Sequence, residues 1–149
     1  MKIVLLGYMG SGKSTIAKEL AKKINSTAID LDDYITNNEK MSVSELFSKK
    51  GEVYFRKKES EYLQKLLLNN EDLVIAVGGG TPCYGDNMWE ILNRSSSFYL
   101  KASIKTLAER LEKEKESRPL IAGLPHDALE EFIAKHLFER RNFYEQANH

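Results

Sequence analysis

The sequence contains almost no cysteine and no long hydrophobic run. Its single cysteine, Cys83, excludes an intramolecular disulfide. No apolar stretch approaches the ~20 residues that a bilayer-spanning helix requires. The N-terminus also lacks the basic segment and apolar run of a secretion signal. These absences predict a cytoplasmic protein that makes no contact with a membrane.

The chain also lacks an excess of charge of either sign. Its 22 basic and 22 acidic side chains cancel to a formal net charge of +0. Nucleic-acid binding usually shows as a basic domain or face, so we expect no nucleic-acid partner. A strong positive potential can then come only from a few clustered arginines, which suits a small anion. The length of 149 residues predicts one domain over residues 1–149.

A glycine-rich segment follows the first apolar run. The run "KIVLLG" has the composition of a buried parallel strand, and residues 13–24 carry apolar side chains at helical spacing. The segment between them has the pattern G-x-x-x-x-G-K-S/T, whose backbone N–H groups surround a phosphate at the start of a helix. The residues of this predicted nucleotide site are Gly7, Gly10, Ser11, Gly12, Lys13, Ser14 and Thr15.

The types of residue in this loop predict ATP and Mg²⁺ as ligands. Lys13 would reach the β- and γ-phosphates, the Ser14 hydroxyl would coordinate Mg²⁺, and Thr15 would cap or pack. Such a loop does not by itself separate a kinase from a GTP switch or a motor. The sequence has no Asn-Lys-x-Asp motif for guanine and too few residues for a motor. A small-molecule kinase is therefore favoured.

Three aspartates follow a second predicted strand around Ala28 and Ile29. Asp30, Asp32 and Asp33 stand at its carboxyl end, where open α/β sheets place their ligands. On an extended backbone Asp30 and Asp32 point the same way. One could then hold a magnesium-bound water while the other meets a substrate hydroxyl. The alternative is that Asp32 or Asp33 caps the helix that follows.

Residues 31–70 are expected to form substrate-binding helices. Gly51 would end a short helix, and a longer one would run through Leu68. Arg56 and Glu59 lie three positions apart on the longer helix, so they are placed to pair. A paired arginine is ready to hold a second carboxylate through two hydrogen bonds. The alternative is an ordinary solvated ion pair.

A third predicted strand runs into Gly78, Gly79 and Gly80. Glycines at the end of a strand let a ligand approach the backbone N–H groups, although they equally suit a flexible turn. Further along, residues 113–125 have the composition of a mobile lid. Arg118 lies in the middle of this segment, where closure would bring its charge onto a phosphate.

The order of strands and helices predicts an α/β fold with a central parallel sheet and helices on both faces. The last predicted helix spans residues 127–147 and carries Arg140 and Arg141 near its apolar stripe. Spacing alone does not rank these two arginines.

Six motifs together resemble the shikimate kinase family. "GYMGSGKS", "DLD", "FRKKE", "GGG", "RPL" and "ERRNFYE" occur in the order typical of that family and span nearly the whole chain. The resemblance implies a three-layer α/β/α P-loop kinase related to the nucleoside-monophosphate kinases. It also implies transfer of the ATP γ-phosphate to the 3-hydroxyl of shikimate, on the route to chorismate and the aromatic amino acids. The expected enzyme is a monomer.

The resemblance also implies a role for individual residues. Asp32 would accept a hydrogen bond from the shikimate hydroxyl, and Asp30 would orient Mg²⁺ through water. Arg56, steadied by Glu59, would hold the shikimate carboxylate together with Arg140. The glycines 78–80 would line the substrate pocket, and residue 118 would come down with the lid onto the phosphates.

The chain departs from the family pattern at two places. Asn142 and Phe143 stand where the family commonly has Pro-Leu before its tyrosine. The family's adenine-packing loop, last strand and last helix also do not appear, so the resemblance implies either a truncated chain or an incomplete adenine site. The alternatives are a gluconate- or nucleotide-type P-loop kinase and a catalytically silent nucleotide-binding module.

Overall fold

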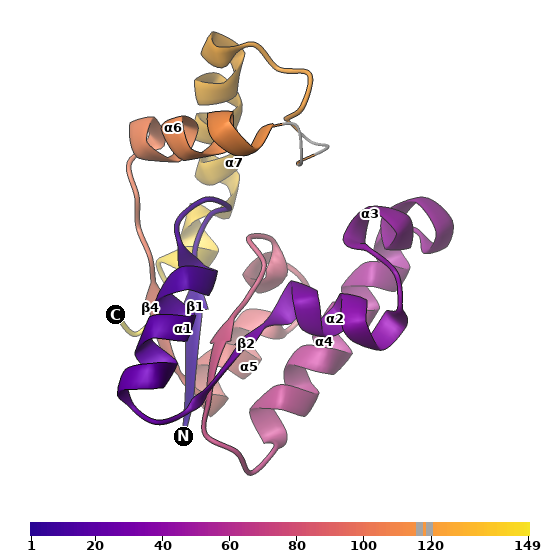
Figure 1. Cartoon of the computed structure of the whole chain (residues 1–149), viewed down its shortest axis with the longest axis vertical. Helices are drawn as coiled ribbons and strands as arrows, with labels where there is room; N and C mark the ends of the chain where they lie inside the picture. The colour runs from indigo at the N-terminus through magenta and orange to yellow at the C-terminus, as the bar shows by residue number, and fades with distance from the viewer. Residues whose placement is uncertain (116–117, 119–120) are drawn as a thin grey trace.

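The computed structural model describes residues 1–115, 118 and 121–149. Within this part of the chain four strands form one sheet, and all their pairings are parallel. The alternating order of strands and helices therefore produces the predicted parallel sheet (Figure 1). The strands are β1 (Lys2–Leu6), β2 (Thr27–Asp30), β3 (Leu73–Ala76) and β4 (Ser96–Tyr99).

The helices largely follow the expected pattern. Gly51 separates a π-helical turn (Leu46–Lys50) from the longer helix that ends at Leu68, as predicted, and it adopts a φ of 92° that favours glycine. A helix after the glycine run was not predicted, although its buried Met88 and Ile91 lie three positions apart. The α-helices are α1 (Lys13–Lys23), α2 (Leu31–Glu39), α3 (Val43–Glu45), α4 (Glu52–Leu68), α5 (Asn87–Arg94), α6 (Ile104–Glu114) and α7 (His126–Tyr144).

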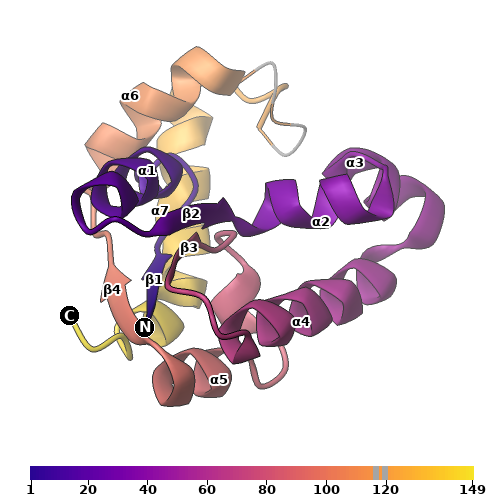
Figure 2. The ribbon, with the colours of Figure 1, turned by 60° about the horizontal axis from the view of Figure 1, so that its bottom comes forward.

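The sheet has the order β2-β3-β1-β4 and separates two apolar clusters. Leu5 on β1 packs with Ala17 and Ala21 of α1 on one face. Its neighbours Val4 and Leu6 point to the other face, where α4, α5 and α7 contribute to the larger cluster. The α1 helix and the α4 and α5 helices lie on opposite sides of the strands in Figure 2. The three-layer α/β/α architecture is therefore confirmed.

The parallel direction of the strands places three predicted motifs at one edge of the sheet. The phosphate loop follows β1, the aspartates follow β2, and the glycine run follows β3. Because the carboxyl ends of parallel strands meet at the same edge, segments far apart in the sequence converge there.

The last residue pairs with the outer edge of β4. The His149 N–H donates to the Ser97 carbonyl at 3.1 Å, and the Tyr99 N–H donates to the His149 carbonyl at 2.9 Å. This is the hydrogen-bond pattern of a parallel pair. The His149 ring also stacks on Phe98, with ring centroids 4.7 Å apart. No strand beyond β4 is assigned among the described residues, but the edge of the sheet is already occupied at this position.

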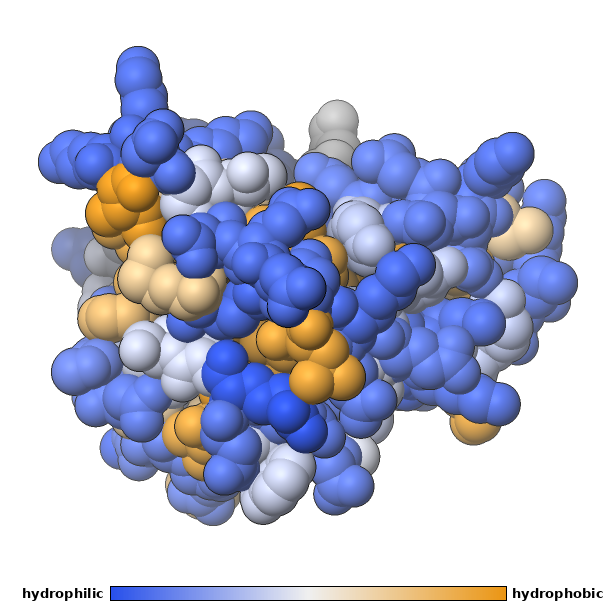
Figure 3. All heavy atoms as spheres, turned by 90° about the horizontal axis from the view of Figure 1, so that it is seen from below, coloured by the Kyte–Doolittle hydropathy of each residue, from blue (hydrophilic) through white to orange (hydrophobic). Residues whose placement is uncertain are grey.

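The outer surface is mostly hydrophilic on the face seen from below. Apolar side chains there form separate spots among polar ones (Figure 3). Among the described residues no helix has both the length and the apolar character needed to cross a bilayer.

Candidate active site

The loop between β1 and α1 has the backbone shape of a phosphate cradle. Gly7, Gly10 and Gly12 have φ values of 150°, 82° and 95°, which residues with a Cβ atom rarely adopt. A Cβ at Gly7 would lie only 2.8 Å from the Leu100 carbonyl oxygen. Gly12 is the N-cap of α1, and no side chain caps the helix. The N–H groups of the first turn of α1 are therefore left for an anion.

Two polar side chains in the loop support the same ligand. The Lys13 ammonium donates to the carbonyl oxygens of Gly7 at 2.7 Å and Tyr8 at 3.0 Å. Burial lowers the pKa of Lys13 to about 8, although the Asp32 carboxylate opposes this shift. The Ser11 hydroxyl is buried and has no hydrogen-bond partner among the described residues. These groups fit a nucleotide phosphate, which would supply the missing charge and acceptors.

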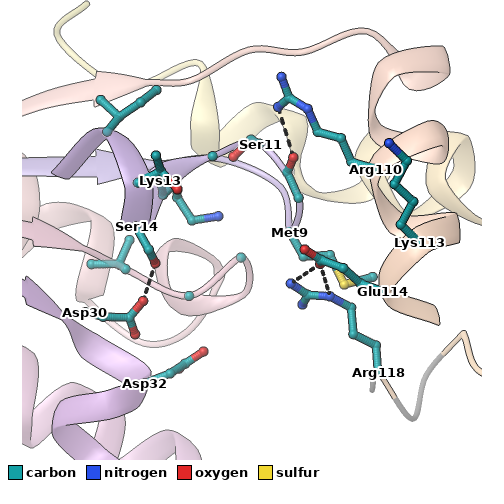
Figure 4. A pocket seen from close by; sticks show the side chains of 17 residues that line it. Met9, Ser11, Lys13, Ser14, Asp30, Asp32, Arg110, Lys113, Glu114 and Arg118 are labelled. Carbon is teal, nitrogen blue, oxygen red and sulfur yellow. Dashed lines mark hydrogen bonds and ion pairs between the residues drawn. The ribbon is translucent and has the colours of Figure 1, made fainter. Parts of the chain in front are cut away.

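A cavity of about 620 Å³ opens over the loop (Figure 4). Gly7 does not line it, but its carbonyl oxygen accepts a hydrogen bond from Lys13. Two cations from α6 also line the cavity, and the sequence did not reveal them: Arg110 and Lys113. Arg110 donates to the Gly10 carbonyl oxygen at 3.1 Å. The predicted residues that line the cavity are Gly10, Ser11, Gly12, Lys13, Ser14, Thr15, Asp30, Asp32, Gly78, Gly79 and Arg118.

Ser14 and Asp30 touch each other on one wall of this cavity. The Ser14 hydroxyl donates a short hydrogen bond to the Asp30 carboxylate (Figure 4). Both oxygens suit Mg²⁺, which takes few protein ligands and completes its shell with water and phosphate. Among the described residues no group of three or more His, Cys, Asp or Glu side chains could hold a metal. The site fits a metal that arrives with a nucleotide.

The structure corrects the predicted geometry of the aspartates. Asp30 ends β2, but Asp32 lies in the first turn of α2, so the two are not on a shared extended backbone. The capping residue is Asp30, whose carboxylate accepts from the Asp33 N–H at 3.1 Å. The expectation that Asp32 or Asp33 caps this helix is therefore wrong. Asp32 still faces the cavity because the helix begins directly at the strand's end.

A second cavity of about 710 Å³ adjoins the first. Phe47, Phe55 and Val43 supply an apolar wall, while Arg56 and Arg140 supply positive charge. The residues that line both cavities are Met9, Asp32, Gly78, Gly79 and Arg118. A group placed in either cavity therefore meets the same carboxylate and the same arginine.

Asp32 is the titratable group at this boundary. Burial raises its pKa from 3.8 to about 6, with Asp30 and Glu59 adding to the rise and Lys13 and Arg56 opposing it. An aspartate in water has a pKa of ~3.9 and is a weak base at neutral pH. The structure makes Asp32 a stronger proton acceptor than a solvated one.

The Arg56–Glu59 pair is buried in the wall of the second cavity. The two side chains meet at 2.8 Å and are 18% and 1% exposed, so this is not a solvated surface pair. The guanidinium also stacks over the Tyr84 ring at 4.0 Å. The buried Arg56 Nε atom has no hydrogen-bond partner among the described residues. An arginine fixed on one side and unsatisfied on another fits a ligand carboxylate.

Glu59 is held from its other side by two residues that the sequence did not single out. The Thr81 hydroxyl donates to Glu59 at 2.8 Å, and the Asn87 amide donates to the Thr81 carbonyl at 2.9 Å. Both residues are fully buried or nearly so. No pattern in the sequence around Thr81 and Asn87 indicates this role, because the contact joins residues of different elements.

The three glycines make room for charged side chains. A Cβ at Gly80 would lie 2.8 Å from an Arg56 terminal nitrogen, and one at Gly79 would lie 3.0 Å from Arg140 Nη1. A Cβ at Gly78 would lie 3.2 Å from an Asp32 oxygen. None of the three has the positive φ of a glycine-specific turn. Close approach, more than flexibility, explains this run.

The structure separates the two adjacent arginines of α7. Arg140 lines the second cavity, whereas Arg141 is exposed and pairs with Glu145 at 3.0 Å. Arg118 lines both cavities and pairs with Glu114 at 2.9 Å. Of the predicted lid, residues 116–117 and 119–120 lie outside the described residues.

Together, a phosphate loop, a neighbouring acceptor cavity and a shared carboxylate define a P-loop kinase with an anionic small-molecule acceptor. Comparison with known proteins then specifies the family. Residues 9–149 match the family model for shikimate kinase. The chain belongs to the shikimate kinase family.

Individual relatives agree with this assignment. The chain is 50% identical over 150 residues to the shikimate kinase of Flavobacterium johnsoniae, covering 99% of this chain and 87% of that protein. The crystal structure of shikimate kinase from Bacteroides thetaiotaomicron matches with a TM-score of 0.94 at 39% identity, covering 99% of this chain and 84% of that chain. The structure of shikimate kinase from Acinetobacter baumannii in complex with shikimate matches with a TM-score of 0.88 at 29% identity. The match covers 97% of this chain and 78% of that chain.

Proposed function

We propose that this chain transfers the γ-phosphate of ATP to the 3-hydroxyl of shikimate, giving shikimate 3-phosphate and ADP for aromatic amino-acid biosynthesis. As a member of its family the chain is an ATP-dependent kinase. The observation that carries the proposal is the pair of cavities that share Asp32. A donor in the first and an acceptor in the second would meet at a single carboxylate.

The first cavity would hold ATP. The phosphate loop would surround the phosphates with N–H groups, and Lys13 would move from its loop carbonyls to the β- and γ-phosphates. Ser14 and Asp30 would hold Mg²⁺, the latter through water, and the metal would neutralise phosphate charge. Arg118 would add a second positive charge from the cavity's opposite wall (Figure 4).

The second cavity would hold shikimate. Its carboxylate would pair with Arg56 and Arg140, whose charges are concentrated on one side of the cavity near Gly79 and Gly80. The carbon ring would lie against the apolar wall. The 3-hydroxyl would then point towards Asp32 at the boundary with the nucleotide cavity.

The chemistry needs mainly alignment and charge neutralisation. Phosphoryl transfer passes through a loose transition state, so the protein gains most by holding donor and acceptor in line. Asp32 would orient the hydroxyl through a hydrogen bond and take its proton late in the reaction. A pKa of about 6 leaves Asp32 ionised at neutral pH yet basic enough for this role.

The apolar wall and the position of Asp32 argue against two of the alternatives. The two arginines would bind the phosphate of a nucleotide acceptor as well as a carboxylate, so the choice between these acceptors rests on the assay below. Gluconate does carry a carboxylate, but its open polyhydroxyl chain would leave the wall of Val43, Phe47 and Phe55 without an apolar partner. A silent nucleotide-binding module would not need Asp32 where the cavities meet.

The proposal is tested by measuring ADP formation from MgATP with shikimate, gluconate, a nucleoside monophosphate or no acceptor. We expect turnover with shikimate alone, and little when GTP replaces ATP. Turnover with gluconate or a nucleotide would show that shikimate is not the specific acceptor. No turnover with any acceptor would favour the silent module.

The proposed enzyme is a cytoplasmic monomer with one domain over residues 1–149. This chain supplies residues for both the nucleotide cavity and the acceptor cavity. The scattered apolar spots on the face in Figure 3 agree with this proposal. Light scattering at working concentrations would detect a dimer and contradict it.

A further inference from the structure

One face of α7 is tied to two loops of the site. His136, Arg140 and Tyr144 lie four positions apart, so their side chains share a face of the helix. The Tyr8 hydroxyl hydrogen-bonds His136 Nδ1 at 2.9 Å. The Tyr144 hydroxyl donates to the Gly79 carbonyl oxygen at 2.5 Å. Arg140 therefore lies between two hydrogen bonds that connect its own helix to the site.

The two ties reach different parts of the site. Tyr8 belongs to the phosphate loop, where its carbonyl oxygen accepts hydrogen bonds from Lys13 and from the Ser11 N–H. Gly79 belongs to the boundary between the cavities, and a Cβ there would lie 3.0 Å from Arg140. The helix is thus anchored to the donor site at one end of this face and to the boundary at the other.

Both tyrosines are suited to hold a fixed position. Tyr8 and Tyr144 are 1% and 0% exposed, so neither hydroxyl has water as a ready alternative partner. Burial raises the pKa of Tyr8 to about 12 and that of Tyr144 well above its usual range, so both hydroxyls keep their protons. The Tyr8 ring meets the His136 ring edge-on, and Arg140 lies 5.9 Å from the Tyr8 centroid.

We propose that Tyr8 and Tyr144 are positioning residues that hold Arg140 over the acceptor cavity. The inference rests on the proposed function, in which Arg140 binds the acceptor carboxylate. Tyr8 also makes the phosphate loop part of the support of the acceptor site. Loss of either hydroxyl would let the arginine-bearing part of α7 move relative to Arg56, which is fixed separately through Glu59. A carboxylate could then no longer form optimal hydrogen bonds with both arginines, and its binding would be weaker.

The first test compares Tyr8→Phe and Tyr144→Phe with the unaltered chain. Each variant keeps its ring and loses one neutral hydrogen bond, so we expect KM for shikimate to rise by about twofold to tenfold. We expect kcat and KM for ATP to stay within about twofold, because the lost contact would support acceptor binding equally in the ground state and the transition state. The control is Tyr99→Phe, since the Tyr99 ring packs on Tyr144 but its hydroxyl makes no hydrogen bond with another described residue.

A second test isolates the Tyr8 contact if a tyrosine variant folds poorly. His136→Ala removes the partner of the Tyr8 hydroxyl, and we expect it to raise KM for shikimate as Tyr8→Phe does. His136→Asn places an amide near the Nδ1 position and should restore much of the loss. The double variant Tyr8→Phe with His136→Ala should be no worse than either single variant, because both remove one contact.

The outcomes separate this inference from the proposed function. If the unaltered chain phosphorylates shikimate and Arg140→Lys raises KM, while both tyrosine variants leave KM unchanged, the positioning role is wrong and the function stands. Equal losses for shikimate and ATP would also contradict it, since they would indicate a general disturbance of the phosphate loop. Absence of shikimate turnover in the unaltered chain would overturn both.

Discussion

The Thr81 hydroxyl donates a 2.8 Å hydrogen bond to the carboxylate of Glu59, which is 1% exposed. The other oxygen of the same carboxylate accepts from Arg56 at 2.8 Å. The glutamate is therefore fixed on both sides, and its orientation sets that of the arginine. The sequence indicated Arg56 and Glu59 on α4, but it did not indicate Thr81, which lies in the turn after β3.

We expect Thr81→Val to raise KM for shikimate about tenfold with little change in kcat. The substitution keeps the shape but leaves a buried carboxylate oxygen without its donor, at a cost of about 1–3 kcal/mol. Thr81→Ser keeps the hydroxyl and is the matched control. Steady-state kinetics with both variants test this, and an equal effect of valine and serine would indicate that packing, not the hydrogen bond, matters.

We expect Arg56→Lys to weaken shikimate binding by about tenfold to a hundredfold while leaving ATP nearly unaffected. Lysine keeps the charge but loses the planar pair of donors that fits a carboxylate, and charged hydrogen bonds contribute about 1.5–3 kcal/mol each. Binding of each ligand can be measured by calorimetry. Equal losses for shikimate and ATP would argue against a role confined to the acceptor.

The adjacent arginines of α7 provide a matched comparison. Arg140→Lys should raise KM for shikimate by about tenfold, since Arg140 lines the second cavity. Arg141→Lys should change KM by less than about twofold, because an exposed pair such as Arg141–Glu145 contributes little. The same kinetic assay tests both variants. A larger effect at Arg141 would reverse the assignment.

Asp32→Asn should lower kcat by about a hundredfold to ten-thousandfold and change KM for shikimate far less. The amide can still contact the hydroxyl but cannot take its proton. Unchanged turnover would exclude the proposed role of Asp32.

The same variant should be more stable than the unaltered chain at neutral pH. Because the pKa of Asp32 is raised from 3.8 to about 6 in the folded state, its ionisation destabilises the ligand-free fold as pH rises through that interval. Removing this charge should increase the free energy of unfolding by on the order of 1–3 kcal/mol at pH ~7.5 and by less at pH ~4.5. Urea unfolding at both pH values measures the difference.

The pH dependence of kcat/KM should differ between the two substrates. For shikimate it should fall below pH about 6, where Asp32 gains a proton and no longer accepts one. For ATP it should fall above pH about 8, where Lys13 loses its charge. Profiles taken with each substrate limiting would separate the two limbs. An acid limb that persists unchanged in Asp32→Asn would assign it to another group.

Much of the fold was predictable because its determinants are local. The apolar run before Gly7 and the helical spacing after Lys13 predicted β1, the loop and α1 from neighbouring residues alone. Gly51 and Leu68 bounded α4 for the same reason. The α5 helix was missed because its short amphipathic pattern lies next to a glycine- and proline-containing turn.

The sequence by itself determined the phosphate loop, the parallel α/β architecture and most of the charged residues of the site, since these follow from residue type and short spacing. It did not reveal Arg110 and Lys113. The tertiary structure decided which of Arg140 and Arg141 faces the acceptor cavity, which aspartate caps α2, and how burial raises the pKa of Asp32. It also placed Thr81 against Glu59 and Tyr8 against His136. These relationships join residues distant in the chain, and their energies depend on water being excluded, which happens only when the helices pack against the sheet.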